Sequence, residues 1–288
     1  MTSNQIGALF MMGSMAAFTF NDALVKTIGA ELPLSQILVV RGGIASVLIY
    51  LLARSLGALQ LTISRSDWLL VLGRCLSEAG ATYLFLSALM RMPIANVTAV
   101  LQMLPLTVTL GAALLLREPV GWRRMSAIGA GFCGMLLIVR PGASGFDWAS
   151  LYALGAVVCV TARDLFTRRM SPQVPSMTVT LMASLTVLCF GLIYGLQQDW
   201  QPMRFDHWKL LVEAAGLIFA GYLFSILAMR NGDVAAVSPF RYSGLLWALF
   251  LGWYMFSEVP DGVTLTGAAI VVGAGLFTLY RERQQFRR

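Results

Sequence analysis

The sequence predicts an all-α integral membrane protein with ten transmembrane helices, arranged as two five-helix repeats of opposite orientation. The composition, the spacing of turn residues and an internal repeat support this fold class. Of the 288 residues, 58% are hydrophobic and only 12% are charged, whereas a soluble domain carries about 25% charged residues. With a mean hydropathy of +0.74, the chain has too little polar surface for a soluble enzyme, a nucleic-acid-binding protein or a secreted disulfide scaffold.

Apolar segments long enough to cross a bilayer, about 20 residues, alternate with short connections rich in proline, glycine and charged residues. The first segment lacks a basic flank and is expected to be a retained helix instead of a cleaved signal peptide. The ten expected spans are 6–28, 34–56, 68–89, 94–116, 125–139, 148–166, 177–196, 208–229, 234–256 and 263–280.

The basic residues of the connections predict the orientation of these spans. Cytoplasmic loops of membrane proteins carry an excess of Lys and Arg. With the amino terminus in the cytoplasm, four basic residues fall outside, namely Arg91, Arg140, Arg204 and Lys209. Twelve fall inside, namely Arg54, Arg65, Arg117, Arg123, Arg124, Arg168, Arg169, Arg230, Arg281, Arg283, Arg287 and Arg288. We therefore expect both termini in the cytoplasm, and the net charge of +7 is mainly a topology signal.

The two halves of the chain repeat each other. Ala95 and Glu118 bracket the fourth span of the first half, and Ala235 and Glu258 bracket the matching span of the second half at the same spacing. A glycine-rich span follows in each case. We expect repeats at 1–140 and 148–288. Because each half has five spans, an odd number, the halves must cross the membrane in opposite directions, as in many secondary carriers.

The acidic residues that close the fourth span of each half (Glu118 and Glu258), Trp122 and the small-residue fifth spans resemble the drug/metabolite transporter superfamily, EamA family. The resemblance implies a bacterial inner-membrane carrier of a small metabolite that works by alternating access, with a central cavity lined by the first four helices of each half. The runs 21–26 and 239–242 are similar to a branch that includes riboflavin and S-adenosylmethionine uptake carriers. We expect riboflavin uptake first, with S-adenosylmethionine uptake and amino-acid or metabolite export as alternatives.

Nine charged residues lie within the expected spans. A charge at the bilayer centre costs roughly 2.5–3.5 kcal/mol even on lenient scales, so nine are hard to sustain against lipid. We expect them to converge on a wet interior or to pair with one another. They are Lys26, Arg41, Arg74, Arg163, Arg241, Asp22, Glu78, Asp164 and Glu213.

An outer polar cluster is expected from the first two spans. Asp22 and Lys26 are four residues apart, so they share a helix face and can form an ion pair. Asn21 lies beside them, and Arg41 sits at a comparable depth in the second span. A static pair that joins the two helices, or a Lys26 that reaches the outer surface, is the structural alternative.

Glu78 is the main candidate for a proton-carrying group, because it lies near the middle of its span and burial favours a protonated carboxyl. Arg74 lies four residues earlier, and permanent neutralisation by this guanidinium is the alternative. Glu213 is the second proton candidate, and it is expected in an outer vestibule.

Arg241 follows Pro239, which removes one backbone hydrogen bond and breaks the preceding turn. A guanidinium next to aromatic Tyr242 and near Trp247 suits a planar, anionic or carbonyl-bearing solute. The alternative is an Arg that stabilises the kink by pairing with an acid such as Glu78.

Four further polar residues complete the interpretation. Gln102 lies in the matching span of the other half, and Tyr222 is expected as a cavity-lining residue. Arg163 and Asp164 are expected at the cytoplasmic boundary, reaching headgroups or lining the inner mouth.

The fifth and tenth spans carry small residues four apart, such as Ala127 with Gly131, Ala130 with Gly134 and Ala269 with Gly273. This spacing allows close helix packing and is expected at the periphery or in a homodimer.

A channel and an intramembrane serine enzyme are the other classes considered. The serine motif around Ser144 lies in a loop, far in sequence from His207, so an enzyme is disfavoured. No metal or cofactor is expected, because the four cysteines stand singly.

Overall fold

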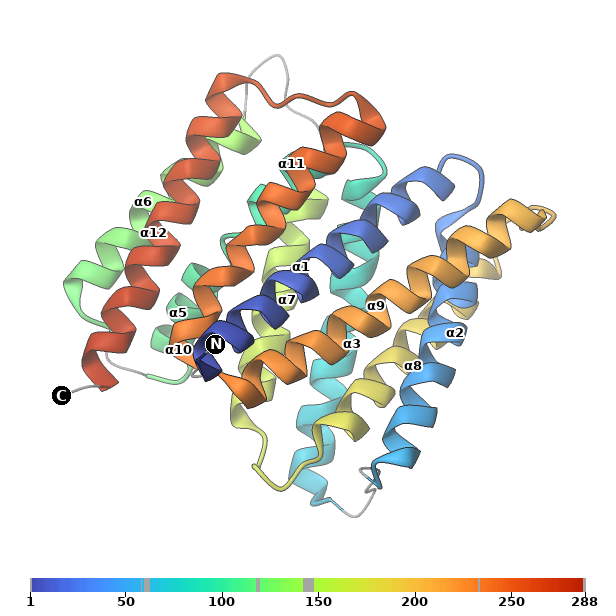
Figure 1. The fold of residues 1–288 in the computed structure, drawn as a ribbon, viewed down its shortest axis with the longest axis horizontal. Helices are drawn as coiled ribbons and strands as arrows, with labels where there is room; N and C mark the ends of the chain where they lie inside the picture. Colours follow the sequence, from blue (N-terminus) through green and yellow to red (C-terminus); the bar gives the residue numbers. More distant parts are fainter. Residues whose placement is uncertain are drawn as a thin grey trace.

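The computed structural model describes residues 2–57, 59, 63–117, 120–141, 148–232 and 234–286. Within these ranges the chain forms α-helices and one short 3-10 segment, without a β-strand (Figure 1). In chain order the elements are α1 (Ser3–Ile28), α2 (Leu34–Ser55), α3 (Arg65–Leu89), α4 (Ile94–Leu101), α5 (Leu104–Leu115), α6 (Trp122–Val139), α7 (Ala149–Arg169), α8 (Ser176–Gly195), α9 (Phe205–Asn231), α10 (Val234–Val237), η1 (Ser238–Tyr242), α11 (Ser243–Phe256) and α12 (Gly262–Phe286).

The predicted membrane fold of two five-helix repeats is confirmed. In the described part of the chain, nine helices are long and apolar enough to cross a membrane, when α4 and α5 are taken as one crossing, Ile94–Leu115. The remaining crossing, the ninth in chain order, consists of α10, η1 and α11. The orientation of the termini stays a prediction from the basic residues. Glu118 and Ser144 lie outside the described residues.

The fourth crossing of each repeat is broken, whereas the sequence predicted an unbroken span at 94–116. In the first repeat, α4 ends at Leu101 and α5 begins at Leu104, one residue before Pro105. In the second repeat, Pro239 lies in the 3-10 segment η1. Proline has no N–H to donate and its ring clashes with the carbonyl group four residues earlier, so the first crossing loses its regular bonding near its middle and the second in the third nearest the inner end.

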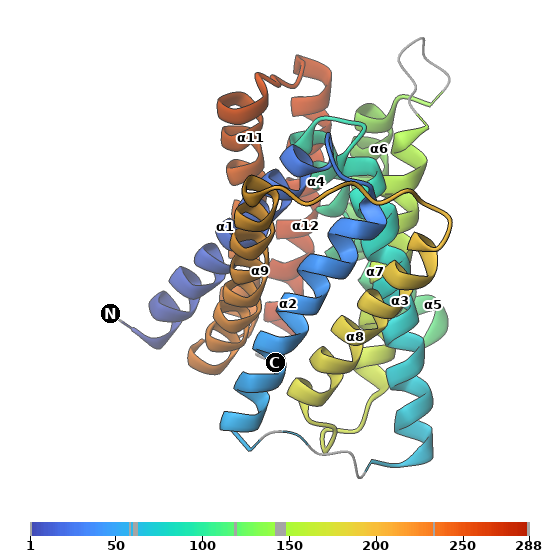
Figure 2. The same cartoon turned by 90° about the vertical axis from the view of Figure 1, so that its right-hand side faces the viewer.

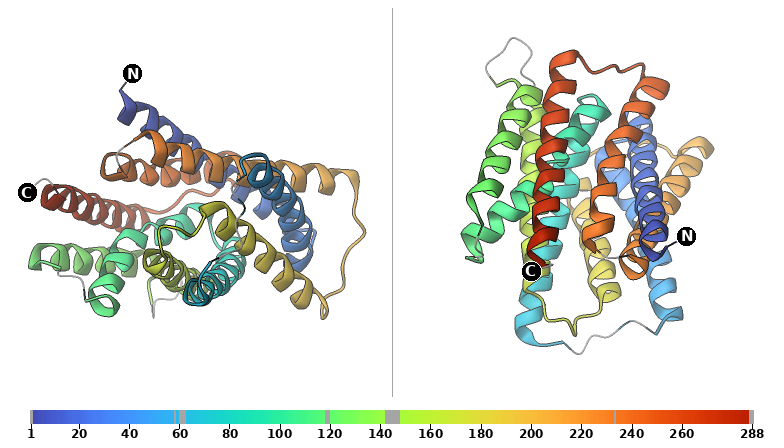
Figure 3. Two further views of the ribbon diagram at one scale, coloured as in Figure 1. Left: turned by 90° about the horizontal axis from the view of Figure 1, so that it is seen from below. Right: turned by 60° about the vertical axis from the view of Figure 1, so that its left-hand side comes forward.

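The helices pack in pairs that follow a two-fold relation between the repeats. α1 packs on α9 and α3 packs on α7, which are the same pair with the repeats exchanged. α2 packs on α8, and α6 packs on α12. Figures 1 and 2 show α2 and α8 side by side at the end of the molecule opposite α6 and α12. The view from below in Figure 3 also shows α6 and α12 together at one end.

The pair α6 and α12 approaches closely because glycines face each other. A Cβ on Gly134 would lie 2.8 Å from the carbonyl oxygen of Gly267 and 3.0 Å from Cβ of Ile270. Part of the predicted small-residue stripe therefore serves packing within the chain. Ala269 and Gly273 face outward, and a homodimer through these helices stays a prediction.

Polar bonds join the two repeats at one end of the bundle. We call this end the outer end; its connections are 29–33, 90–93, 196–204 and 257–261. The side-chain amide of Gln36 donates to the carbonyl oxygen of Gln201 at 2.8 Å and accepts from its N–H at 3.0 Å. Ser35 donates to the side-chain oxygen of Gln198 at 2.7 Å. The connection between α8 and α9 is thereby fixed to the start of α2.

Lys26 forms an ion pair with the second repeat at the outer end, and this pair is more buried than the two exposed ion pairs there. Its Nζ donates to Oε1 of Glu258 at 2.7 Å and to the carbonyl oxygen of Met92 at 2.7 Å. Oε2 of Glu258 accepts from the N–H of Ile94, the first residue of α4, at 2.9 Å. The side chains of Lys26 and Glu258 are only 12% and 21% exposed, so the pair is shielded from water and salt.

Two exposed ion pairs also join the repeats at the outer end. Arg140 bonds both carboxylate oxygens of Asp261, and this bonding holds the pKa of Asp261 well below its usual range. Glu31 bonds His207 and Arg204, and the bond to His207 is the main cause of a lowered pKa of Glu31. A lowered carboxyl pKa stabilises the folded state above the unfolded pKa, and this contribution is lost as the pH falls through the folded pKa.

Substitution of Gly134 by Ala should loosen the contact between α6 and α12. The added Cβ meets backbone that cannot move without shifting a helix, so we expect a loss of about 1–3 kcal/mol of stability. Gly129→Ala is the matched control, because a Cβ there meets nothing within 4 Å and alanine favours the helix by up to about 1 kcal/mol. Thermal unfolding in detergent measures both. Equal melting temperatures for the two variants would contradict the observed packing.

Glu258→Gln should destabilise the protein because it leaves the Lys26 ammonium without a counter-charge. We expect a loss of roughly 2–3 kcal/mol, less than the ~3–5 kcal/mol of a fully buried pair because Glu258 is partly exposed. The control is Asp261→Asn, which removes an exposed pair while Asn can still cap α12 at Thr264. Chemical denaturation should show a clearly smaller change for the control, and the reverse order would refute the role of the Lys26 tie.

Candidate functional site

The interior holds two polar clusters, one toward the outer end and one toward the opposite, inner end. The outer triad consists of Asn21, Asp22 and Arg41. The inner cluster is larger and is built by α3, α7 and η1. Its members are Arg74, Glu78, Arg163, Asp164 and Arg241.

The outer triad joins α1 to α2. The guanidinium of Arg41 donates to Oδ1 of Asn21 at 3.0 Å, and the amide of Asn21 donates to Oδ1 of Asp22 at 2.9 Å. Arg41 is only 5% exposed, and Asp22 is the acidic group near it. The amide therefore lies between a buried cation and a buried anion and hydrogen-bonds to both.

The predicted ion pair between Asp22 and Lys26 is wrong. Lys26 pairs with Glu258 of the other repeat instead, and Asp22 is bonded by Asn21. Lys26 lies one helical turn closer to the outer end than Asp22, where the carboxylate of Glu258 and the carbonyl oxygen of Met92 are both within reach. Nor does Lys26 extend to the outer surface, since its side chain is 12% exposed.

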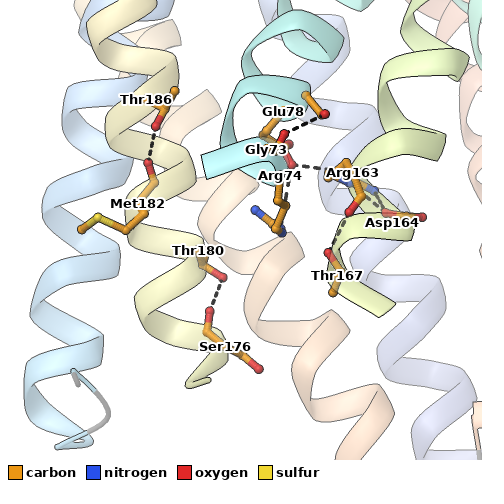
Figure 4. A network of polar contacts seen from close by, with 11 residues as sticks. Gly73, Arg74, Glu78, Arg163, Asp164, Thr167, Ser176, Thr180, Met182 and Thr186 are labelled. Atoms are coloured by element: carbon orange, nitrogen blue, oxygen red, sulfur yellow. Dashed lines mark hydrogen bonds and ion pairs between the residues drawn. The ribbon is translucent and has the colours of Figure 1, made fainter. Parts of the chain in front are cut away.

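The inner cluster joins α3 to α7 (Figure 4). The guanidinium of Arg163 lies 3.3 Å from Oε2 of Glu78 and 2.8 Å from Oδ1 of Asp164. Arg74 is farther from Glu78, at 3.9 Å, and its Nε and Nη1 atoms are buried without a partner in the described structure. Glu78 is thus held mainly by the other repeat and only weakly by its own helix.

Arg163 and Asp164 were expected at the membrane boundary, and the structure places them in the interior instead. Their side chains are 23% and 32% exposed, and Arg163 pairs with Glu78 of α3 instead of reaching headgroups. A sequence signal could have revealed this position. Asp164 is followed four residues later by Arg168, as Asp22 is followed by Lys26, so the two aspartates occupy matching places in the first helix of each repeat.

Tyr222 links the two clusters. It lies in α9 within electrostatic range of Arg41 in the outer triad and of Glu78 and Arg163 in the inner cluster. Its ring packs edge-on against Phe18 of α1, with 5.3 Å between the ring centroids. We call the outer triad, Tyr222 and the inner cluster together the polar path; its residues come from both repeats.

Arg241 lies at the inner cluster within electrostatic range of Asp164 and Arg163. Its side chain is accessible, and no hydrogen bond or ion pair to it occurs among the described residues. The expected alternative, a kink-stabilising pair with Glu78, is not formed, because Glu78 bonds Arg163.

The two helix breaks lie near each other. Gln102 follows α4, and its amide nitrogen approaches Gly244, which lies just after η1 at the start of α11. Trp247 packs on Phe20 of α1 with ring centroids 6.0 Å apart. Gln102 and Trp247 therefore lie where α4, α11 and α1 meet.

Two expected site residues, Tyr242 and Glu213, lie outside both polar clusters. Tyr242 is buried, and its ring packs against Gly275 of α12, where any side chain would collide with it. Glu213 is exposed on the outer half of α9, apart from both polar clusters.

The chain is similar to known transporters along almost its whole length. The sequence pattern of the EamA-like transporter family matches residues 5–140 and 147–280. A riboflavin transporter of Vibrio cholerae is 32% identical over 98% of this chain and 95% of the relative. A pseudopaline exporter of Pseudomonas aeruginosa is 28% identical over 92% of this chain and 93% of the relative. An S-adenosylmethionine uptake transporter of Rickettsia prowazekii is 23% identical over 96% and 94%.

A solved crystal structure has the same fold, with a TM-score of 0.64 and 20% identity over 96% of this chain and 98% of the other. The expected family is confirmed by the matches to both repeats, and the relatives are transporters, not enzymes. The chain therefore belongs to the EamA-like transporter family and is a multi-pass membrane protein.

Proposed function

We propose that this protein carries riboflavin into the cell across the bacterial inner membrane by alternating access. The observation that carries the proposal is the polar path, in which the guanidinium groups of Arg41, Arg74 and Arg163 lie within electrostatic range of the aromatic Tyr222. Riboflavin is neutral and planar, with carbonyl oxygens on its ring system and hydroxyls on its side chain. Guanidinium groups can donate to such carbonyl oxygens and stack on such a ring.

The similarity to the Vibrio cholerae riboflavin transporter supports the same substrate. The relatives named for S-adenosylmethionine and pseudopaline make these the competing solutes. Import and export differ only in the gradient that drives a carrier, so the assay must impose each direction.

Alternating access requires the two ends of the path to open in turn. The two-fold pairing of α1 with α9 and of α3 with α7 lets one repeat rock against the other around a central site. The ties of Lys26, Gln36 and Arg140 to the second repeat close the outer end in this structure. They must break before a solute can enter from outside.

Glu78 is the proposed proton carrier. Its carboxylate is held by Arg163 of the other repeat, so formation of an O–H bond on Glu78 would remove a charge that joins the repeats. Proton binding would thereby weaken the contact between α3 and α7 at the inner cluster.

Proteoliposomes that contain the purified protein should accumulate labelled riboflavin in a saturable manner, with S-adenosylmethionine and aromatic amino acids as weaker substrates or none. Counterflow from vesicles preloaded with unlabelled riboflavin removes the need to guess the driving gradient. If folded protein shows no saturable riboflavin uptake or counterflow, the proposed substrate is wrong. Saturable transport of another panel member would then name the substrate.

Glu78→Gln should abolish the response of uptake to an imposed proton gradient, because glutamine cannot take up the proton. Glu213→Gln is the matched control, since Glu213 lies outside the polar clusters, and it should keep the wild-type response. The measurement is initial uptake as a function of the pH difference across the vesicle membrane. An unchanged response in Glu78→Gln would refute the proton role, and loss of the response in the control alone would assign it to Glu213.

A further inference from the structure

Arg241 is the accessible guanidinium of the interior clusters that has no bound partner among the described residues; Arg74, which is only 15% exposed, keeps a 3.9 Å contact with Glu78. Arg41 bonds Asn21, and Arg163 bonds Glu78 and Asp164. Arg241 lies near these groups, yet within the described residues it neither donates a hydrogen bond nor forms an ion pair. Its side chain is accessible although it lies within a membrane crossing, in the third of that crossing nearest the inner end. It lies within electrostatic range of Asp164 and Arg163, and its five donors are free to bind a solute there.

The nearby carboxylates are already bonded. Asp164 is 2.8 Å from the guanidinium of Arg163, and Glu78 is 3.3 Å from the same group. A rearrangement that neutralised Arg241 with either acid would leave Arg163 short of a partner. The positive charge of Arg241 is therefore available to a solute.

The two interior clusters together carry more positive than negative groups. Four guanidinium groups, those of Arg41, Arg74, Arg163 and Arg241, face three carboxylates, those of Asp22, Glu78 and Asp164. With every group ionised, one positive charge remains. A cationic solute would add to this excess in a medium where charges are weakly screened.

We infer that Arg241 holds an electron-rich edge of the substrate, such as paired carbonyl oxygens or a carboxylate, and that the carrier thereby selects neutral or anionic solutes and rejects cations. The inference rests on the proposed function, in that it names the class of solute for the same site. The isoalloxazine ring of riboflavin presents such an edge. S-adenosylmethionine carries a sulfonium charge and meets the excess of guanidinium groups.

Transport of riboflavin by Arg241 variants tests the contact. Arg241→Gln should lower kcat/KM for riboflavin at least about tenfold, the loss expected for strong hydrogen bonds to a guanidinium. Arg241→Lys should recover part of it, because lysine keeps the charge and loses the planar fork. Arg230→Gln is the control, as it removes an exposed guanidinium at the end of α9. Wild-type kcat/KM in Arg241→Gln would overturn the inference.

Chemical labelling decides the inference even if riboflavin is not the substrate. Phenylglyoxal modifies accessible guanidinium groups, and mass spectrometry locates the label in the folded wild-type protein. We expect Arg241 to react faster than Arg41, which is buried and bonded to Asn21. Riboflavin or flavin mononucleotide should protect Arg241, and S-adenosylmethionine should not.

The outcomes distinguish the proposed substrate, riboflavin, from the proposed role of Arg241. Absence of riboflavin transport with protection of Arg241 by flavin mononucleotide would refute the proposed substrate and support the role of Arg241. Slow labelling of Arg241, protection by none of the three probes, or protection by S-adenosylmethionine alone would overturn the inference.

Discussion

The ammonium group of Lys26 needs a counter-charge where α1 reaches the outer end, because it lies in a region with little water. Glu258 supplies that charge from the connection between α11 and α12, and its second oxygen accepts the N–H of Ile94 at the start of α4. One carboxylate thus compensates a buried cation, caps a helix that has no side-chain cap of its own and joins the two repeats. The position of α4, and hence of its break at Gln102, depends on this interaction.

The two repeats use matching positions for different purposes. Asp22 and Asp164 occupy the same place in the first helix of each repeat, but Asn21 precedes the first and Arg163 precedes the second. The outer triad therefore has an amide where the inner cluster has a guanidinium that reaches across to Glu78. Because the second repeat has Arg163 where the first has Asn21, more charged groups lie toward the inner end. A pseudosymmetric scaffold can thereby hold a site with distinct ends.

The sequence predicted the helices and the two-repeat plan because lipid requires each crossing to be apolar and to satisfy its own backbone. The depth of each charged residue within its span, and the residue with which it pairs, were harder to predict. Helix α7 continues to Arg169, beyond the expected end of the sixth span at 166. Arg163 and Asp164 therefore lie nearly one turn farther from the end of their helix than the expected span implied. The partner of Lys26 is 232 residues away, and no local spacing indicates such a contact. Pro239 did indicate where the fourth crossing of the second repeat weakens, but the break at Pro105 was not expected, nor was the turn of Tyr242 away from the site.

Arg241 and Tyr242 are neighbours in the broken crossing but contact different parts of the structure. Successive residues of a 3-10 helix point about 120° apart, so neighbours in η1 face different surroundings. Tyr242 packs against Gly275 of α12, a helix held to α6 by the contact at Gly134 and Gly267. Arg241 faces the inner cluster instead. The broken segment is thus anchored on the α6 and α12 side through Tyr242, while Arg241 stays unpaired near Asp164 and Arg163, as the proposed contact with a solute requires.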